Sequence, residues 1–367
     1  MIVTSCTKPE TRTRIDWKIA GSLPPLTEQK ALGVAGPVSG FSGNQLLIAG
    51  GANFPERLPW EGGAKKYHDA VYLFDPASGT FNNDAARLRL PHPVAYAATA
   101  VADDRIVYAG GENEAGISDK VYMLQWDGKE LQTTSLPMLP LGLTNAAMTY
   151  HEETLYLTGG ETATETSDKF WRLSLRQPEA GWQPLAPMPH PSSHAVQLIL
   201  RNRGQDWLFV FGGRCKNRNG ISTLHKAVFA FHLKTGEWQQ KKPLPYSLAA
   251  GSGIVTPDNQ ALLFGGDKGS IFRQVETLIA QAATLEGAAR DSVILRKNRL
   301  QSTHAGFSRS VLQYQPENDA WDVLSEIPFP VPVTTTALYD RGKIYITSGE
   351  MKPGVRTPHI LEGTMIP

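Results

Sequence analysis

The sequence predicts an all-β fold made of repeated units. Glycine and proline are frequent, with 34 and 26 residues in a chain of 367, and this composition suits many short strands joined by tight turns. Apolar strands that end in glycine recur six times along the chain. Because repeats extend a single core, a chain of this length can form one large domain.

Each unit contains a strand that ends in paired glycines. Neighbouring pairs begin 49 residues (Gly110 to Gly159) to 60 residues (Gly50 to Gly110) apart, and a period near 50 is that of kelch repeats. The glycine-ending strand is the second of its unit. A third strand follows it, and a fourth carries an aromatic residue before a proline turn. Four strands per unit form a blade, so the sequence predicts a six-bladed kelch β-propeller. The pairs are Gly50-Gly51, Gly110-Gly111, Gly159-Gly160, Gly212-Gly213 and Gly265-Gly266, with residues 344–349 as the sixth copy.

The two ends of the chain complement one another. Residues 15–19 fit a fourth strand that lacks three partners, and the last segment, from residue 334 to 364, fits three strands that lack a fourth. Pairing them closes the ring and removes an open sheet edge. We therefore expect a single propeller over residues 15–367, closed by the N-terminal strand, with residues 1–14 as a tail or signal remnant.

Blade five carries a helical insertion at about residues 267–308. The spacing from Gly265 to Gly349 is 84 residues, which is one repeat plus an extra segment. Ile271, Phe272 and Val275 recur at helical spacing, so a helix capped by Ser270 is expected, followed by a second helix over residues 291–303. These helices are expected to form a lid or wall beside the funnel of the propeller.

Charge and cysteine content exclude several partners. Lysine and arginine total 36 against 35 acidic residues, so no net field draws the chain to nucleic acid. Cys6 and Cys215 are too few for a disulfide framework or a multi-cysteine metal site, and we expect no metal. The stretch Val3-Thr4-Ser5-Cys6 resembles a bacterial lipobox. Either Cys6 is a lipid anchor or the match is accidental and the N-terminus is cytosolic.

Polar residues gather on one face of the predicted propeller, in the loops that follow the glycines or precede the first strands. Loops on a rigid scaffold are the usual location of binding and catalytic groups. Glu350 and Arg356 differ from the others because the rigid turn Pro353-Gly354 lies between them and could hold both toward one cavity. An ordinary ion pair is the alternative interpretation. The face collects Asn53, Glu112, Asn113, Asn145, Glu161, Ser193, His194, Arg214, Ser252, Asp267, Thr335 and Glu350.

The stretch Gly349-Glu350-Met351-Lys352-Pro353-Gly354-Val355-Arg356-Thr357 closely resembles the signature of the sialic acid mutarotases, the N-acetylneuraminate epimerase family. Residues 49–52, 65–67, 211–217 and 271–272 agree as well. These proteins are six-bladed kelch propellers of the bacterial periplasm. In the family pattern this loop lies mid-chain, whereas here it lies in the last blade, so the chain resembles a cyclically permuted branch. Where the family has an arginine near the start of blade four, this chain has Ser193-His194.

The resemblance implies a function and a site. The activity would be interconversion of the α and β anomers of N-acetylneuraminate, with no cofactor, in the periplasm or on an outer-membrane lipoprotein that faces it. Glu350 matches the family's acid–base glutamate and Arg356 its associated arginine, which we expect to bind the carboxylate of the sugar acid. The further substrate contacts expected are Lys352, His194, Arg214, Tyr67, Glu161 and Asn53.

Two other functions fit the repeats. A non-catalytic propeller could bind a glycan or a protein through the same face, which would leave the Glu350 motif unexplained. A copper radical oxidase needs a cysteine crosslinked to tyrosine and paired histidine ligands, and Cys215 has no such supporting motif. The sequence carries no signal for an oligomeric state.

Overall fold

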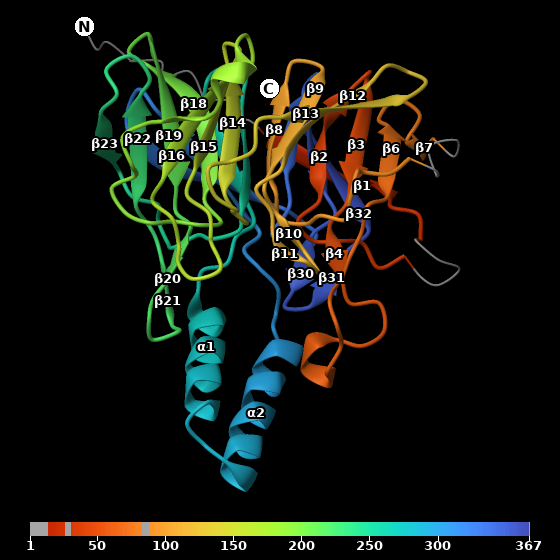
Figure 1. The fold of residues 1–367 in the computed structure, drawn as a ribbon, viewed down its shortest axis with the longest axis vertical. Helices are drawn as coiled ribbons and strands as arrows, with labels where there is room; N and C mark the ends of the chain where they lie inside the picture. The colour runs from red at the N-terminus through yellow and green to blue at the C-terminus, as the bar shows by residue number, and fades with distance from the viewer. Residues whose placement is uncertain (1–13, 26–30, 83–87, 367) are drawn as a thin grey trace, which may run out of the picture.

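The computed structural model describes residues 14–25, 31–82 and 88–366 and is a six-bladed β-propeller, as the sequence predicts. Each blade is a four-stranded antiparallel sheet, and Figure 1 shows the propeller from the side. The strands are β2 (Val38–Ser42), β3 (Gln45–Ala49), β6 (Val71–Asp75) and β7 (Thr80–Phe81) in blade one; β8 (Ala98–Ala102), β9 (Arg105–Ala109), β12 (Val121–Trp126) and β13 (Leu131–Leu136) in blade two; and β14 (Ala147–His151), β15 (Thr154–Thr158), β16 (Phe170–Ser174) and β17 (Gln183–Pro184) in blade three.

The second half of the chain forms the other three blades. Their strands are β18 (Val196–Asn202), β19 (Gln205–Phe211), β22 (Val228–His232) and β23 (Trp238–Lys241) in blade four; β24 (Ser252–Val255), β25 (Ala261–Phe264), β26 (Ser310–Gln315) and β27 (Ala320–Glu326) in blade five; and β28 (Ala337–Asp340), β29 (Lys343–Thr347), β32 (His359–Ile366) and β1 (Arg14–Ser22) in blade six.

The N-terminal strand β1 is the outer strand of blade six. It pairs antiparallel with β32 from Arg14 opposite Ile366 to Ser22 opposite His359. Glu362, whose side chain is 3% exposed, accepts ion pairs from Lys18 of β1 at 3.3 Å and Lys343 of β29 at 3.0 Å. Both ends of the described chain are thus held in one sheet.

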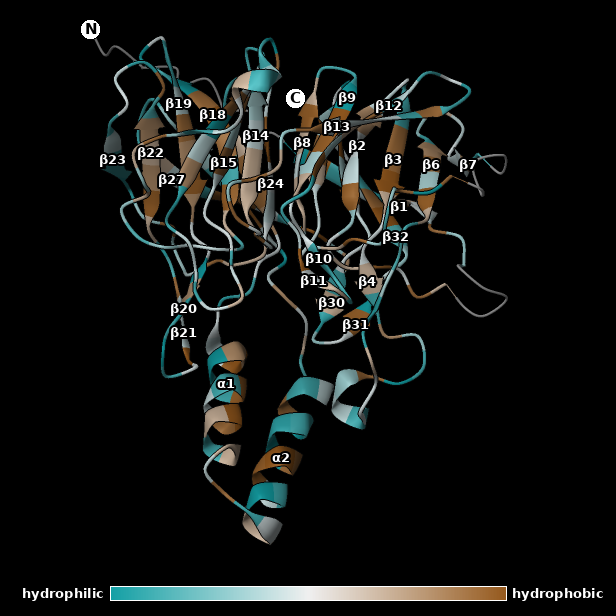
Figure 2. Cartoon of the chain, in the orientation of Figure 1, coloured by the Kyte–Doolittle hydropathy of each residue, from teal (hydrophilic) through white to brown (hydrophobic). Residues whose placement is uncertain are grey.

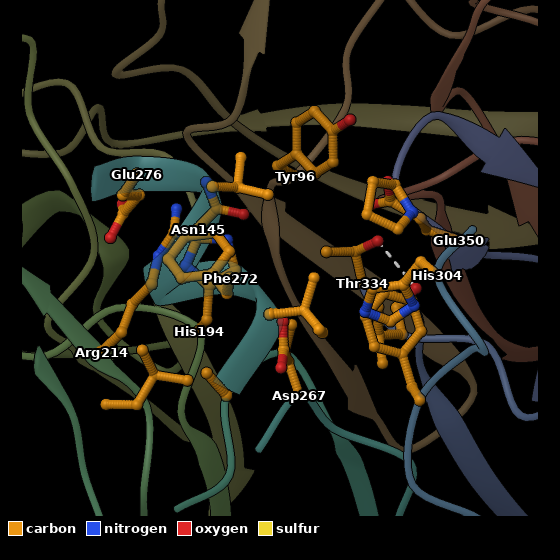
Figure 3. A pocket seen from close by; sticks show the side chains of 18 of the residues that line it. Tyr96, Asn145, His194, Arg214, Asp267, Phe272, Glu276, His304, Thr334 and Glu350 are labelled. Carbon is orange, nitrogen blue, oxygen red and sulfur yellow. Dashed lines mark hydrogen bonds between the residues drawn. The ribbon is translucent and has the colours of Figure 1, made fainter. Parts of the chain in front are cut away.

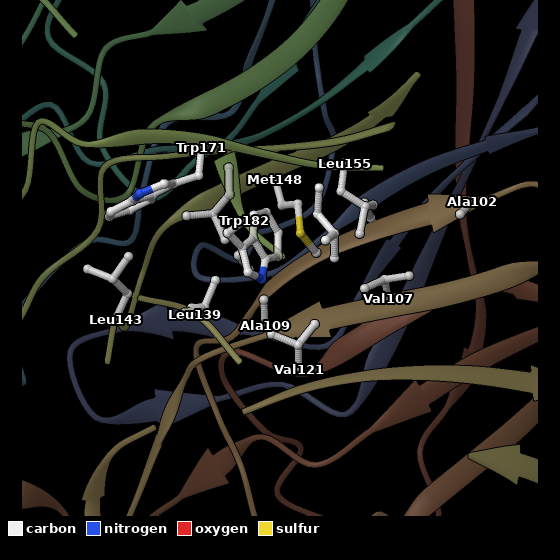
Figure 4. Packing of buried hydrophobic residues seen from close by; sticks show 14 residues of the cluster. Ala102, Val107, Ala109, Val121, Leu139, Leu143, Met148, Leu155, Trp171 and Trp182 are labelled. Carbon is white, nitrogen blue, oxygen red and sulfur yellow. The ribbon is translucent and has the colours of Figure 1, made fainter. Parts of the chain in front are cut away.

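Hydrophobic side chains fill the space between neighbouring blades. Figure 2 shows hydrophobic stretches in blade strands such as β3 and β22. The cluster between blades two and three packs Met148, Trp171 and Trp182 against strands of both blades (Figure 4). The indole N–H of Trp182 in blade three donates to the Pro137 carbonyl at 2.9 Å. Trp238 in blade four and Trp321 in blade five each donate in the same way to a backbone carbonyl near the end of the preceding blade. These aromatic residues therefore join blades through both packing and hydrogen bonds.

A closed ring of six backbone hydrogen bonds surrounds the neck of the central channel. One residue per blade, just before the first strand, has a left-handed φ between 49° and 64°. The N–H of each donates to the carbonyl of its equivalent in the neighbouring blade, at 2.7 to 3.0 Å, and the bond from Gly36 to Thr334 closes the circle. We call these residues the neck ring; they are Gly36, Tyr96, Asn145, His194, Ala250 and Thr334.

Short hairpins and two helices extend from one face of the propeller (Figure 1). Helix α1 (Ser270–Ala282) and helix α2 (Gly287–Ser302) lie within the insertion of blade five. The helices contact other blades: Glu276 of α1 accepts two bonds from Ser222 at 2.7 and 2.8 Å, and Asn298 of α2 donates to Trp60 O at 3.0 Å. The hairpins are β4 (Ala52–Asn53) with β5 (Lys66–Tyr67), β10 (Glu112–Asn113) with β11 (Gly116–Ile117), β20 (Arg214–Lys216) with β21 (Ser222–Leu224), and β30 (Glu350–Lys352) with β31 (Val355–Arg356); the 3-10 helices are η1 (Pro59–Glu61) and η3 (Pro178–Ala180).

Two details of the predicted helices are wrong. Ser270 does not cap α1 but is its first residue, and Gly269 precedes it with φ of 88°. The left-handed turn at this glycine leads directly into the helix, and a Cβ there would lie 2.7 Å from Leu224. Helix α2 starts at Gly287 rather than residue 291. Its first turn, Gly-Ala-Ala-Arg, has no large apolar residue, so hydrophobic periodicity did not predict it. In the described part of the chain, neither helix has the length and apolar content needed to cross a bilayer.

Candidate functional site

A cavity of about 470 Å³ lies at the face that carries the hairpins and helices. The neck ring forms part of its lining through Tyr96, Asn145 and His194, and helix α1 contributes an apolar wall that includes Phe272 and Val275. The insertion predicted to be a lid or wall therefore borders this cavity. Figure 3 shows side chains from several blades that converge on it.

A second ring of equivalent positions surrounds the cavity. In each blade, the residue that follows the glycines makes a backbone bridge to the residue that precedes the neck ring, as Glu350 does with Val333. Five of the six positions carry charged side chains, and all five line the cavity. We call this set the charged ring; in blade order it is Ala52, Glu112, Glu161, Arg214, Asp267 and Glu350.

Glu350 is held by the loop in which it lies. Its Oε1 accepts a hydrogen bond from the Gly354 N–H at 2.7 Å and lies 2.9 Å from Arg356 Nη1, in an ion pair that lacks the alignment of a hydrogen bond. Gly354 has φ of 76°, and a Cβ there would lie 2.4 Å from Pro59, so only glycine fits this turn against η1. The Glu350 side chain is 20% exposed. Its carboxylate is thus held in place on the cavity wall, beside the positive charge of Arg356.

Arg356 lies behind Glu350 rather than in the cavity. Its side chain is 4% exposed, its Nε donates to Ala52 O at 3.3 Å, and its guanidinium lies 5.2 Å from the ring centre of Phe54. Through these contacts Arg356 joins the Glu350 loop to the segment that contains Ala52 and Phe54. The carboxylate of a ligand in the cavity would therefore not meet Arg356.

Arg214, which the sequence also proposes as a substrate contact, does line the cavity. It pairs with Glu161 at 3.3 Å, and its guanidinium lies 4.9 Å from the ring centre of Phe272. Its Nε is buried and has no hydrogen-bond partner among the described residues. Arg214 is therefore a positioned, partly exposed cation at the cavity.

His194 is neutral at the neck of the cavity. Burial, with a smaller contribution from the positive charge of Arg214, holds the pKa of His194 well below its usual value. Its Nδ1 lies 3.0 Å from Ser193 Oγ, which donates to Glu161 Oε1 at 2.6 Å. His194 can thus bind a ligand by hydrogen bonds without adding charge.

Asp267 and His304 line the cavity on the side of blade five. Burial raises the pKa of Asp267, although the Gly269 N–H at 2.7 Å and the charges of His304 and Arg214 act in the opposite direction. His304 has a lowered pKa, mainly through burial, and its Nδ1 accepts the Gly306 N–H at 3.0 Å. The neutral imidazole therefore carries its proton on Nε2.

The structure separates the predicted site residues into two groups. Glu350, His194, Arg214 and Glu161 line the cavity, whereas Arg356, Lys352, Tyr67 and Asn53 do not. Neither group has a tested role, and their assignment as catalytic or binding residues stays a prediction.

The four predicted residues outside the cavity lining have other partners. Lys352 donates to Ser302 O of α2 at 3.3 Å, and Tyr67 donates to Glu112 Oε1 at 2.6 Å. Burial, followed by the bond to Glu112, raises the pKa of Tyr67 to about 12. Asn53 donates to Gly33 O at 2.9 Å and contacts His68. Side chains alternate along a strand, so Asn53 points away from the side to which Ala52, the charged-ring residue of blade one, points.

Several lining residues were absent from the predicted site. Tyr96 and Thr334 belong to the neck ring. The sequence could have indicated them, because each neck-ring residue precedes the first strand of its blade at a nearly fixed distance along the chain. Phe272 and His304 come from the insertion, which no other blade repeats, so no periodic signal marks them. Within the described residues, one group of three side chains could hold a metal, namely His151, Glu152 and Asp206, and none of these lines the cavity.

The fold is a six-bladed propeller, and its cavity is lined by a ring of ionisable side chains. The chain belongs to the N-acetylneuraminate epimerase family, whose family model matches residues 4–133 and 136–366.

Curated relatives agree with this membership. The N-acetylneuraminate epimerase of Vibrio vulnificus is 27% identical over 61% of this chain and 58% of the relative. That of Yersinia pestis is 28% identical over 62% of this chain and 57% of the relative, and N-acetylneuraminate epimerase 1 of Escherichia coli is 25% identical over 52% and 50%. The chain therefore spans about half the length of the curated relatives it matches.

Proposed function

We propose that this protein interconverts the α and β anomers of N-acetylneuraminate by acid–base ring opening and closure. Family membership and the names of the relatives support this assignment. The observation that carries it is the Glu350 carboxylate, which lies on the wall of the cavity and is held by the Gly354 N–H and Arg356.

In the proposed reaction, Glu350 is the base. It takes the proton from the hydroxyl on the anomeric carbon C2, the bond from C2 to the ring oxygen breaks, the ring oxygen takes up a proton from water or a neighbouring acid, and the open-chain keto acid forms. Rotation then presents the other face of C2 to the former ring oxygen, and the sugar recloses as the other anomer. A positioned acid–base group typically contributes about 10²–10⁴-fold to such a rate.

Arg214 is the group that we propose for the carboxylate of the substrate. It lines the cavity, is 22% exposed, and has an Nε without a partner among the described residues. A guanidinium can bind a carboxylate with two parallel hydrogen bonds, which would fix C2 relative to Glu350. Arg356, to which the sequence assigns this role, instead orients Glu350 from behind.

Saturation-transfer NMR between the two anomers tests the function directly. Wild-type protein should accelerate their exchange, and Glu350→Gln should lower the rate at least about 10²-fold because the amide cannot take the proton. Glu165→Gln is a matched control, since Glu165 is exposed on the same face and does not line the cavity. Wild-type exchange rates in Glu350→Gln would contradict the mechanism. Binding of the sugar without faster exchange by the wild type would favour the non-catalytic propeller.

Three further assignments belong to this proposal. We infer that the repeats are of the kelch type, that the chain represents a cyclically permuted branch, and that it acts on sialic acids in carbohydrate metabolism. The glycine spacing supports the first, and the Glu350 loop in the last blade supports the second.

We also propose a periplasmic location, with Cys6 as a lipid anchor on the outer membrane. The resemblance of residues 3–6 to a lipobox supports it, and Cys6 lies outside the described residues. Incorporation of labelled fatty acid in cells should occur in the native chain and be lost in Cys6→Ser. Equal labelling of both, or labelling of neither, would contradict the anchor.

A further inference from the structure

Three consecutive blades place three different charged groups at equivalent positions. Arg214, Asp267 and Glu350 are the charged-ring residues of blades four, five and six, each fixed by the same backbone bridge to the residue that precedes the neck ring. Asp267 therefore lies between the other two around the cavity. Figure 3 shows its carboxylate directed into the cavity between Arg214 on one side and Glu350 with His304 on the other.

The reacting carbon of the substrate also carries three oxygen-bearing groups. C2 of N-acetylneuraminate bears a carboxylate, a hydroxyl and the ring oxygen. The proposed function, on which this inference rests, assigns the carboxylate to Arg214 and the hydroxyl to Glu350. In that arrangement Asp267, which lies between the other two, is the remaining charged-ring group of these three blades, and it is assigned to the ring oxygen.

We propose that Asp267 is a second catalytic residue, the general acid that protonates the ring oxygen when the ring opens and takes that proton back when it closes. Glu350 removes the hydroxyl proton, the O–H electron pair forms the C2 carbonyl, and the electron pair of the C2 to ring-oxygen bond moves to the ring oxygen. That oxygen receives the proton of Asp267. On closure, Asp267 accepts the proton of the attacking hydroxyl and Glu350 returns its proton to the carbonyl oxygen, so both residues regain their starting states.

The surroundings of the two carboxyl groups fit opposite roles. Burial raises the pKa of Asp267, and the negative charge of Glu350 acts in the same direction. The Gly269 N–H and the charges of His304 and Arg214 oppose this shift. Glu350, by contrast, has a guanidinium 2.9 Å away. Paired titratable groups in such different environments are typical of acid and base partners.

Asp267→Asn tests the assignment because the amide keeps an acceptor for the Gly269 N–H but cannot supply a proton. We expect the anomer exchange rate to fall at least about 10²-fold while the affinity for the sugar changes little. In wild-type protein the pH–rate profile should decline at high pH as the acid loses its proton, and the variant should lose this limb. Asp291→Asn, in the exposed first half of α2, is the matched control.

Four outcomes separate the possibilities. A wild-type rate and pH profile in Asp267→Asn, with Glu350→Gln inactive, would overturn this inference and leave the proposed function intact. A wild type that does not accelerate exchange would remove the proposed function itself. Loss of the high-pH limb in His304→Gln but not in Asp267→Asn would assign the proton to His304 and refute the proposal. If Asp267→Asn does not fold, Asp267→Glu replaces it, and a high-pH limb that stays at the wild-type pH in that variant overturns the proposal.

Discussion

The two arginines of the site should affect different steps, and their exchange for glutamine separates them. Arg214 lines the cavity and its side chain is 22% exposed, whereas Arg356 is 4% exposed and contacts Glu350, Ala52 and Phe54. Arg214→Gln should therefore raise KM for the sugar acid. Arg356→Gln should lower kcat and stability, because Glu350 loses the group that orients it.

The expected sizes follow from these contacts. Hydrogen bonds to charged groups contribute about 1.5–3 kcal/mol, which corresponds to roughly 10- to 150-fold in affinity. Because Arg214 is 22% exposed and also pairs with Glu161, we expect the lower part of that range. Removal of one partner of a buried ion pair destabilises proteins by about 3–5 kcal/mol. Glu350 keeps 20% exposure, so Arg356→Gln should lie near or below the smaller value.

Two assays measure these effects on the same samples. Anomer exchange measured by NMR at several sugar concentrations gives kcat and KM, and urea unfolding gives the free energy of unfolding. Arg218→Gln is the control, since Arg218 is exposed on the hairpin that carries Arg214. A higher KM at unchanged stability in Arg356→Gln, together with an unchanged KM in Arg214→Gln, would refute these roles. That pattern would return the substrate carboxylate to Arg356, as the sequence predicts.

Two other predictions concern stability. Ser348→Ala should lower the free energy of unfolding by about 1–3 kcal/mol, because the Ser348 hydroxyl accepts the buried Val34 N–H at 2.9 Å and alanine would leave that donor unpaired; an unchanged urea midpoint would contradict this. Burial lowers the pKa of His68 and of His225 to about 4, and that of His194 well below its usual value. Since the unfolded imidazoles bind protons near pH 6.5 and the folded ones do not, stability should fall as the pH drops from about 6.5 toward 4. Urea midpoints measured across this range should show the decline, His225→Phe should reduce it, and a flat profile down to about pH 5 would count against the buried neutral histidines.

The architecture could be predicted from the sequence because a physical need recurs at each blade. At Gly51 and Gly111 the backbone adopts φ of 84° and 86°, and a Cβ would lie 2.6 Å from a valine of the preceding segment at both positions. Such positions admit little but glycine, so the repeat is visible without any structure. The complementary ends of the chain likewise predicted that β1 would lie in blade six.

The directions of the site side chains could not be predicted in the same way. Arg356 and Glu350 are opposite one another on a hairpin whose register shifts between Glu350 and Lys352, yet only Glu350 lines the cavity. Sequence spacing brings both to one loop but does not show the bulge. His304 was missed for a different reason, since it follows a helix whose path across the face depends on contacts with η1 and the Glu350 loop.

The neck ring explains how one scaffold supports both a regular fold and an irregular site. Its six hydrogen bonds join main-chain atoms only, so they form equally well at Gly36, Tyr96, Ala250 or His194. Side chains at these positions can therefore differ between blades without loss of the ring, and the chemistry of the cavity varies while the backbone stays periodic. The bond between Gly36 and Thr334 also joins the first blade to the last. Because the funnel closes through backbone bonds between blades, its geometry does not depend on which blade contains the ends of the chain.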